Sequence, residues 1–437
     1  MSQTGESHER QVGQGRRAVW SWAFYDFANS AYTTLIVTFI YAVYFTQQIA
    51  PDAITGTALW SRAVTVSAVL VAILSPVLGA IADRGGYRRR LLMTATLVTV
   101  VGVCVLAFAG PGEVVFALTV FIISNVAYEL CGVFYNSYLP DLAPQEKIGR
   151  ISGYGWALGY LGGLMAMAVA LFVFIQPEIA PFGLDKASGQ HVRATTILVG
   201  IWFGLLAIPM FVWVKEPPRK AHPPLGTVVR EAVGQVKRTF AEVRDDYKHI
   251  FQLLLARLIY NDGLVTIFAF GPIYAAETFD FTLTEVMYWG LALNLTAGLG
   301  SFAMGFLDDR IGGKKTILLT LIGLAIGTIW AVTADSKLSL YMAGIWVGLF
   351  VGPNQAASRS LLGRFVPPSK EVEFYGFFAF SGKAMAFAGP LSLGIVTQMT
   401  GSQRAGVSTV LAFFVIGALV LWPLNEKAGI EQAGRAA

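Results

Sequence analysis

The sequence predicts an all-α membrane protein with twelve transmembrane helices, arranged as two six-helix bundles with both termini in the cytoplasm. Three observations support this fold class. Hydrophobic residues make up 55% of the 437 residues and charged residues only 14%, whereas about 25% of the residues in soluble domains are charged. The apolar residues form long runs separated by short charged loops, and one loop motif occurs twice. A chain of this composition cannot cover a surface that faces water.

Twelve apolar runs are long enough to cross a bilayer, because a hydrocarbon core about 30 Å thick requires about 20 helical residues. The first run is too long for the apolar core of a signal peptide, so we expect it to remain uncleaved. The runs lie near residues 19–46, 58–82, 90–109, 114–139, 150–176, 194–215, 250–276, 284–307, 313–334, 338–363, 372–398 and 405–424.

The positions of Lys and Arg orient these spans. Most of the 32 basic residues lie in the terminal segments, in the long central loop and in the loops on the same side. Because cytoplasmic loops carry the excess of Lys and Arg in membrane proteins, both termini are expected to be cytoplasmic. The loops on the opposite side contain only four basic residues, which are Lys186, Arg193, Lys337 and Arg404.

A long polar segment, residues 216–249, joins the sixth span to the seventh. Its prolines at 217–218 and 223–224 cannot continue a helix. Beyond them, apolar residues recur every three or four positions, which predicts an amphipathic helix on the membrane surface. We favour a linker helix over a regulatory docking helix. The apolar residues are Val229, Val233, Val236, Phe240, Val243 and Tyr247. The predicted organisation is a tail over 1–18, a bundle over 19–215, this linker, a second bundle over 250–425 and a tail over 426–437.

One loop motif occurs twice. Residues 79–89 read GAIADRGGYRR and residues 305–315 read GFLDDRIGGKK, with matching positions offset by 226. Each copy follows the second span of a six-span half, which indicates two bundles related by a parallel repeat. In each copy the first glycine allows two helices to approach closely, and the aspartate can face the positive end of a neighbouring helix. The basic pair at the end of each copy can bind anionic headgroups.

The repeated motif resembles the signature of the major facilitator superfamily, in which it latches the two bundles on the cytoplasmic side. Residues 25–32, 139–144, 149–160 and 260–263 look like the branch that includes the fungal autophagy-related vacuolar effluxers and many uncharacterised bacterial relatives. This resemblance implies amino-acid export for the fungal members and leaves the cargo of the bacterial members open. It also implies a gating site, formed by Asp83, Arg84, Arg88, Asp309, Arg310 and Lys314.

Several charged residues fall inside predicted spans, where one charge at a helix centre costs at least about 2.5–3.5 kcal/mol. Glu129, Asp262 and Lys383 are placed near the midplane. Asp262 is five positions from Arg257, so the two side chains do not share a helix face, and we expect Asp262 to meet a partner across the cavity. The alternative is structural, because a carboxylate paired with a buried basic residue could simply hold helices together.

The family resemblance places spans one, four, seven and ten around a central cavity. Residues 352–355, in the tenth span, contain a Gly-Pro pair and are expected to break the helix and free backbone groups for the cavity. The fourth span carries a polar stripe that includes Glu129. The candidate substrate and ion site consists of Tyr25, Asp26, Asn29, Asn125, Glu129, Asn136, Arg257, Asn261, Asp262, Asn354, Gln355, Arg359 and Lys383.

The function that these patterns favour is secondary active transport of a small polar or zwitterionic solute by alternating access, with amino-acid efflux and proton coupling as the specific form. A nucleotide-driven pump is excluded for this chain because no phosphate-binding loop motif is present. An enzyme is disfavoured because no His/Asp or Ser/His cluster occurs. The alternatives are an exporter or flippase of lipids or drug-like amphiphiles, or a substrate sensor that does not transport.

The expected partners are membrane lipids, the small-molecule substrate and protons. We expect no nucleic acid, no cofactor and no metal. The chain is expected to work as a monomer in the cell (inner) membrane, as a multi-pass protein.

Overall fold

The computed structural model describes residues 15–179, 181–216 and 225–434. Most of the predicted N-terminal tail, the prolines between 217 and 224 and the last three residues therefore lie outside the described residues. The same holds for the side chains of Val229 and Val233 in the predicted amphipathic helix. Within the described ranges, every regular element is a helix, as predicted.

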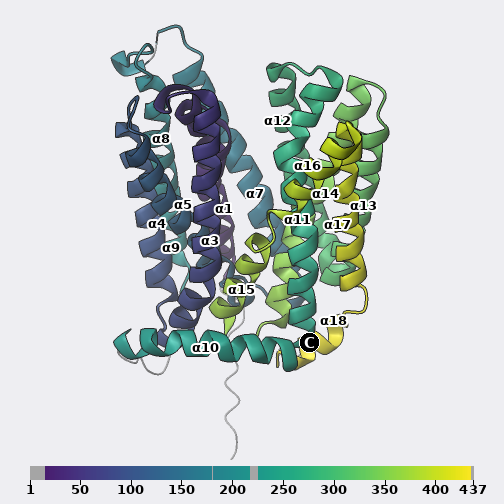
Figure 1. The fold of residues 1–437 in the computed structure, drawn as a ribbon. Coiled ribbons are helices and arrows are strands. Elements are labelled where there is room, and N and C mark those ends of the chain that lie inside the picture. The colour runs from purple at the N-terminus through teal and green to yellow at the C-terminus, as the bar shows by residue number, and fades with distance from the viewer. Residues whose placement is uncertain (1–14, 180, 217–224, 435–437) are drawn as a thin grey trace, which may run out of the picture.

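Two groups of long helices stand side by side and converge at one end of the molecule (Figure 1). The first group contains the first six predicted spans. Its long helices are α1 (Arg16–Ala31), α3 (Ala53–Gly85), α4 (Arg88–Val105), α5 (Val114–Asn136), α7 (Ile148–Val169) and α8 (Gln190–Leu206). Shorter elements extend or connect them: η1 (Tyr32–Phe39), α2 (Tyr41–Tyr44), η2 (Phe45–Ile49), η3 (Leu106–Phe108), α6 (Leu139–Leu142), η4 (Gln145–Lys147), η5 (Ala170–Ile175), η6 (Pro181–Gly183) and α9 (Ile208–Trp213).

The second group contains the remaining predicted spans. Its helices are α11 (Lys248–Phe279), α12 (Leu283–Ile311), α13 (Gly313–Thr333), α14 (Lys337–Phe365), α15 (Glu371–Lys383), α16 (Ala388–Thr400), α17 (Gln403–Leu421) and the short α18 (Glu426–Gln432). In both groups the second long helix, α3 or α12, ends in the repeated loop motif.

Eleven segments of the described chain are long and apolar enough to cross a membrane. The helix α14, which corresponds to the predicted tenth span, is not among them, although it has 29 residues. It carries polar and charged side chains such as Asn354 and Arg359, which lower its hydropathy, and both of these side chains are buried against other helices. The count of twelve spans and the orientation of the termini stay predictions.

The helix α10 (Leu225–Asp245) crosses the end at which the two groups converge (Figure 1). The amphipathic spacing predicted this helix. Val243 on its apolar face is buried, whereas Phe240 is 51% exposed and its ring centroid lies 6.4 Å from that of Phe377 on α15. We call this end of the molecule, covered by α10 and α18, the linker face.

Small residues bring the two groups into contact near the linker face, where α3 packs against α15 and α7 packs against α12. A Cβ atom at Gly79 would lie 2.7 Å from the carbonyl oxygen of Val372. A Cβ atom at Gly305 would lie 2.9 Å from Cα of Arg150. Both distances are too short for any side chain, so the first glycine of the repeated motif is required in both copies.

The predicted break in the tenth span is wrong, because α14 continues through Pro353. Proline is tolerated in a membrane helix when neighbouring helices satisfy the freed backbone groups. The predicted eleventh span is interrupted instead: α15 ends at Lys383 and α16 begins at Ala388. The first span also changes at Tyr32 from an α-helix to the wider π-helix η1.

Candidate functional site

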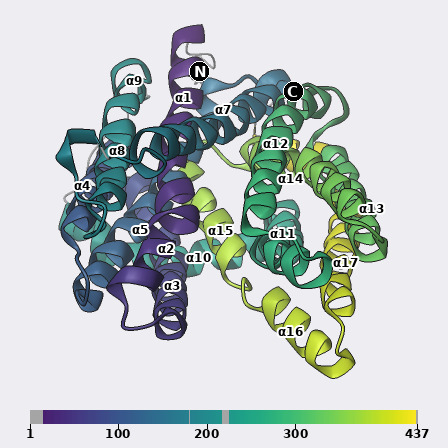
Figure 2. The same ribbon diagram turned by 90° about the horizontal axis from the view of Figure 1, so that it is seen from above.

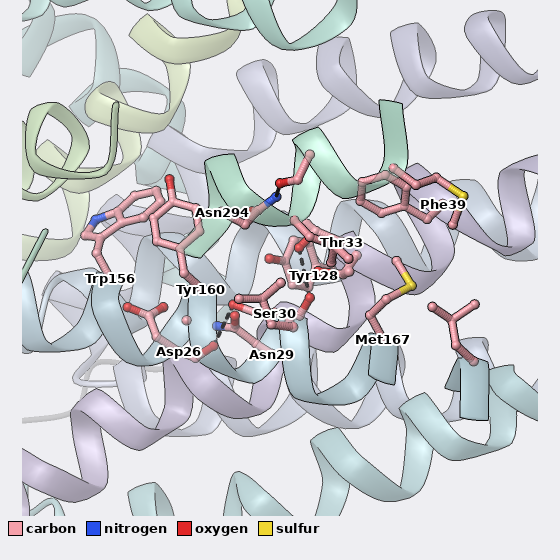
Figure 3. Close-up of a pocket in the computed structure, with 18 residues that line it drawn as sticks. Asp26, Asn29, Ser30, Thr33, Phe39, Tyr128, Trp156, Tyr160, Met167 and Asn294 are labelled. Carbon is pink, nitrogen blue, oxygen red and sulfur yellow. Dashed lines mark hydrogen bonds between the residues drawn. The ribbon is translucent and has the colours of Figure 1, made fainter. Parts of the chain in front are cut away.

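A cavity of about 270 Å³ lies between the first span, α5, α7 and α12. Asp26 and Trp156 lie at one end of it, and Phe39 and Met167 at the other (Figure 3). Because α1 begins at the linker face, the Asp26 end of the cavity is the one nearer to that face (Figure 1). We call it the inner end, and the opposite end the outer end. The lining includes the polar side chains of Asn29, Ser30, Thr33 and Thr34 and the rings of Tyr128, Trp156 and Tyr160. The cavity therefore offers a charged inner end and an apolar outer end to a bound molecule.

Asp26 is joined to the opposite group by Arg359 of α14. Nη1 of Arg359 lies 3.0 Å from Oδ2 of Asp26 and 3.0 Å from Oδ1 of Asn136. Its Nε donates to Oγ of Ser152 at 2.9 Å, and its guanidinium lies 4.9 Å from the ring centroid of Trp22. The Arg359 side chain is only 3% exposed. The second group thus inserts a cation into a polar cage of the first group, at the inner end of the cavity.

A second ion pair joins the two groups through Glu129 of α5 and Lys383 of α15. Nζ of Lys383 lies 2.8 Å from Oε1 of Glu129, and the two side chains are 33% and 28% exposed. Glu129 follows Tyr128, which lines the cavity. In these two pairs, Asp26–Arg359 and Glu129–Lys383, the first group supplies the acid and the second group supplies the base.

Asp262 of α11 is buried, at 1% exposure. Its Oδ2 accepts the N–H of Gly389, in the first turn of α16, at 2.7 Å. Its Oδ1 is buried and has no hydrogen-bond partner among the described residues. The expectation that Asp262 meets a partner across the cavity is wrong, because the side chain is turned towards α16 of its own group.

Arg257 is a buried cation within the second group. It donates to the carbonyl oxygen of Phe378 at 2.8 Å and to Oγ of Ser381 at 3.2 Å. Its guanidinium lies 3.7 Å from the ring centroid of Phe378. No carboxylate of the described chain forms an ion pair with it, so a carbonyl dipole and an aromatic face stabilise its charge.

Three predicted polar residues connect helices inside the second group. Gln355 donates to Oδ1 of Asn261 at 3.0 Å, and Asn261 donates to the carbonyl oxygen of Gly382 at 3.0 Å. Asn354 donates to Oγ1 of Thr320 at 2.9 Å. None of these three residues is among those that line the cavity in the described chain.

Tyr25 and Asn125 are buried within the first group. The hydroxyl of Tyr25 lies 2.7 Å from Oγ1 of Thr96, and its ring stacks on Tyr135 with centroids 5.0 Å apart. Asn125 is 5% exposed in α5. Asn29, by contrast, lines the cavity, so the structure brings only some of the predicted site residues to one place.

The first copy of the repeated motif contacts the opposite group through Asp83. Its Oδ2 accepts the N–H of Glu373, in the first turn of α15, at 2.8 Å. The N–H groups of a first turn lack helical partners and form the positive end of the helix dipole, so a carboxylate there is stabilised. Arg84 pairs instead with Glu231 of α10 at 2.6 Å, whereas Arg310, its counterpart in the second copy, is exposed.

The second copy makes the same kind of contact through Asp309. Its Oδ1 accepts the N–H groups of Gly149 at 2.8 Å and of Arg150 at 3.2 Å, both in the first turn of α7. The guanidinium of Arg150 also pairs with Oδ2 of Asp309. Each aspartate of the repeat therefore caps a helix of the opposite group, as the motif predicted.

The basic residues of the two copies differ in their surroundings. Arg88 is fully buried, and its guanidinium lies 2.6 Å from Asp141 and 3.3 Å from Glu371 of the opposite group. Lys314, at the equivalent position, is partly exposed, and its backbone N–H donates to Glu426 at 2.9 Å.

Sequence reasoning missed a second buried ion pair at the linker face, in which Nη1 of Arg364 lies 2.7 Å from Oδ1 of Asp308. The doubled aspartate in the second motif copy was a signal for it. The hydroxyl residues of the cavity, Ser30, Thr33 and Thr34, follow Asp26 by four, seven and eight positions, and this spacing on one helix face was a signal for them. The other missed residues are Ser30, Thr34, Tyr128, Ser152, Trp156, Tyr160 and Asn294 of the cavity and cage, and Asp141 and Glu371 at the linker face.

Solved structures share this architecture. The proton:xylose symporter XylE of the major facilitator superfamily matches with a TM-score of 0.74 at 13% identity, over 96% of this chain and 98% of that one. The transporter FucP in the outward conformation matches with a TM-score of 0.74 at 11% identity, over 94% of this chain and 100% of that one. At these identities the likeness establishes the fold.

Sequence relatives establish the family. The chain is 26% identical over 422 residues to the uncharacterized MFS-type transporter YxiO of Bacillus subtilis, covering 94% of this chain and 95% of the relative. It is 25% identical over 302 residues to autophagy-related protein 22-1 of Aspergillus fumigatus, which covers 63% of this chain but only 47% of that protein's length. Residues 49–434 match the family described as "Vacuole effluxer Atg22 like". The chain therefore belongs to the Atg22-like effluxer family, a branch of the major facilitator transporters, and is a multi-pass membrane transporter rather than an enzyme.

Proposed function

We propose that the chain exports a small zwitterionic solute, such as an amino acid, by alternating access in the cell (inner) membrane, as a monomer driven by protons. One observation carries the substrate class. In two of the inter-group ion pairs, Asp26–Arg359 and Glu129–Lys383, the acid belongs to the first group and the base to the second, whereas the linker-face pairs Arg88–Glu371 and Arg150–Asp309 have the opposite arrangement. A zwitterion between the groups can offer its ammonium to the acids and its carboxylate to the bases through charge-assisted hydrogen bonds. The family description as an effluxer supports the direction.

The ion pair between Asp26 and Arg359, at the inner end of the cavity, can link solute binding to the movement of one helix group against the other. Asp26 lines the cavity, whereas Arg359 is only 3% exposed. An ammonium group in the cavity therefore competes with Arg359 for Asp26 and weakens one contact that joins the groups. Because a ligand shifts an equilibrium by its differential affinity for the two states, binding favours opening of the linker face. Release of the solute from the cavity restores the pair.

We assign the coupling proton to Asp262 rather than to Glu129. A buried ionised carboxylate with an unpartnered oxygen is costly, and Oδ1 of Asp262 has no hydrogen-bond partner among the described residues. Glu129 has Lys383 at 2.8 Å, which stabilises its charged form. In addition, Asp262 accepts from the first turn of α16, beyond the interruption of the eleventh span. A change in its charge can therefore act on the position of α16.

Counterflow in proteoliposomes with a pooled metabolite set tests the substrate class. We expect zwitterionic amino acids to exchange and their amides or des-amino acids to fail. Asp26→Asn should raise the apparent KM for the zwitterion by about tenfold, the cost of one charge-assisted hydrogen bond. Asp335→Asn, which changes an exposed acid, is the control and should leave KM unchanged. Equal exchange of a simple cation or anion would contradict the proposal.

Accumulation driven by a pH gradient tests the coupling. Asp262→Asn should abolish accumulation yet keep solute exchange, whereas Glu129→Gln should impair binding itself. If both neutral variants still concentrate the solute when only a pH gradient is supplied, neither residue carries the proton.

A second cargo, a drug-like amphiphile, is favoured by the apolar outer end of the cavity. The residues there include Phe39, Leu164, Met167, Leu171, Met287 and Leu291. The same counterflow assay separates the two candidates, because an amphiphile that exchanges faster than any amino acid would support this second one.

A further inference from the structure

A second cavity, of about 280 Å³, forms a groove on the outer surface where α7 of the first group meets α12 of the second. The first span contributes Trp20 to its wall. Figure 2 shows α7 between α1 and α12. Almost all side chains that line the groove are apolar or aromatic, and several of them are strongly exposed, such as Leu299 at 60% and Phe302 at 47%. In a membrane, such a surface faces acyl chains.

The groove lies beside the cavity of the candidate site, because the two share lining residues. Tyr160, Leu164 and Asn294 line both. A chain-like apolar ligand in the groove would therefore end beside the cavity.

The opposite end of the groove carries stacked aromatic rings. The ring of Tyr154 lies 5.3 Å from that of Trp20 and 5.6 Å from that of Phe302, and the ring of Phe306 lies 6.0 Å away. Rings of Trp and Tyr are enriched at the level of the lipid headgroups, where an apolar body and a polar edge are both satisfied. This end of the groove therefore has the composition of the membrane interface.

One helical turn beyond these rings, towards the linker face, each of the three helices carries an arginine. Residues four positions apart share one helix face, so each arginine is on the same face of its helix as one of these rings. Two of the arginines, Arg16 and Arg310, are exposed. The third, in α7, is 33% exposed; its guanidinium pairs with Asp309 and lies 5.2 Å from the ring centroid of Phe306. The pairs of arginine and ring are Arg16 with Trp20, Arg150 with Tyr154, and Arg310 with Phe306.

We propose that this groove binds an anionic phospholipid from the leaflet at the linker face, with one acyl chain along α7 and α12 and the phosphate among Arg16, Arg150 and Arg310. Apolar walls, interfacial rings and a cluster of positive charge occur here in the order in which a phospholipid presents its chain, its glycerol region and its phosphate. A neutral lipid matches the walls but not the three arginines, so charge selects the occupant.

The site includes parts of both groups, because α1 and α7 belong to the first and α12 to the second. The lipid would bridge them beside the contact between Asp309 and the first turn of α7. It would therefore stabilise the conformation in which the linker face is closed.

Native mass spectrometry of the purified full chain tests the site. The protein in detergent is titrated with dioleoyl-phosphatidylglycerol or with dioleoyl-phosphatidylcholine, and the affinity for the first bound lipid is compared. We expect phosphatidylglycerol to bind at least tenfold more tightly. Arg16→Gln combined with Arg310→Gln should weaken phosphatidylglycerol by about fivefold per arginine and leave phosphatidylcholine unchanged. Arg90→Gln, an exposed arginine of α4 away from the groove, is the control and should keep the preference.

A second pair of variants tests the groove. Leu299→Trp fills it and should weaken both lipids by about tenfold. Leu205→Trp on α8, where the leucine is also 60% exposed, should bind both lipids as the wild type does. The proposal is overturned if the wild type binds the two lipids equally, if the double arginine variant keeps the wild-type preference, or if Leu299→Trp binds lipid as Leu205→Trp does.

Discussion

The two copies of the repeated loop join the helix groups by the same contact but rest on different charges. In both copies an aspartate accepts N–H groups from the first turn of a helix of the opposite group, Asp83 from α15 and Asp309 from α7. The buried cation of the first copy, Arg88, lies 2.6 Å from Asp141 of its own group and 3.3 Å from Glu371 of the opposite group. Beside the second copy the buried cation is Arg364, and the described carboxylates within 4 Å of it, Asp308, Asp309 and Glu426, all belong to its own group.

This difference separates what the repeat must preserve from what it leaves free. A helix N-terminus can be capped only by an acceptor at one place, so the aspartate recurs at a fixed position in the motif. A buried guanidinium can be neutralised by any carboxylate within reach. The residue that supplies the guanidinium, and the carboxylates that pair with it, can therefore differ between the two copies. The first copy should therefore depend on its buried cation more than the second copy depends on the equivalent residue.

The largest expected effect is on stability, from Arg88→Gln. This change removes the buried guanidinium that pairs with Asp141 and Glu371, and breaking a buried ion pair costs about 3–5 kcal/mol. Lys314→Gln, at the equivalent position, should cost less than about 1 kcal/mol because its side chain is partly exposed. Thermal unfolding followed by size-exclusion chromatography in detergent measures both. If Arg88→Gln and Lys314→Gln lowered the stability equally, the two copies would not differ in their dependence on these basic residues.

The next effect is on transport, from neutralising the capping aspartates. Asp83→Asn should leave the protein folded and able to bind substrate but slow exchange by about tenfold, since a hydrogen bond to a charged group contributes about 1.5–3 kcal/mol. Asp309→Asn should slow exchange more, because Asp309 also pairs with the guanidinium of Arg150. The two variants are compared by their rates of solute exchange in proteoliposomes. Wild-type exchange by the double Asn variant would show that the aspartates do not act as a gate.

The smallest effect concerns the contact of the first copy with α10. Arg84 and Glu231 form a partly exposed ion pair, at 35% and 53% exposure, which is worth at most about 1 kcal/mol and weakens with salt. Arg84→Gln should therefore speed proteolysis in residues 216–249 by up to about fivefold at low salt, and the difference should vanish at high salt. Arg310→Gln, in the second copy, should not change the rate. If Arg84→Gln changed the rate of proteolysis equally at low and high salt, the contact between Arg84 and α10 would depend on packing rather than on charge.

Much of the fold could be predicted because a bilayer imposes a simple length and composition on each span. The exceptions are in the tenth and eleventh spans. The helix α14 falls below the hydropathy of a span because of polar side chains such as Asn354 and Arg359, and only the structure shows that these are buried against other helices. Its Pro353 does not break it, whereas the eleventh span is interrupted after Lys383.

The candidate site was predicted less completely. Asp26, Glu129, Arg359 and Lys383 stood out because charge inside a span is costly. Their pairing did not, because the acid and the base are 333 positions apart in one pair and 254 in the other. Tyr25 is adjacent to Asp26, yet its ring is buried in the first group, since neighbouring residues of a helix point about 100° apart.

The sequence by itself determined the membrane class, the repeat and the aspartate that caps a helix in each copy, because these depend on composition, on periodicity and on local backbone chemistry. Only the tertiary structure decided which acid meets which base, where the eleventh span is interrupted and which residues line the cavity. Helical periodicity assigns each residue to a face of its own helix. The neighbour of that face depends on how all the helices pack together, and no local pattern in the sequence records that arrangement.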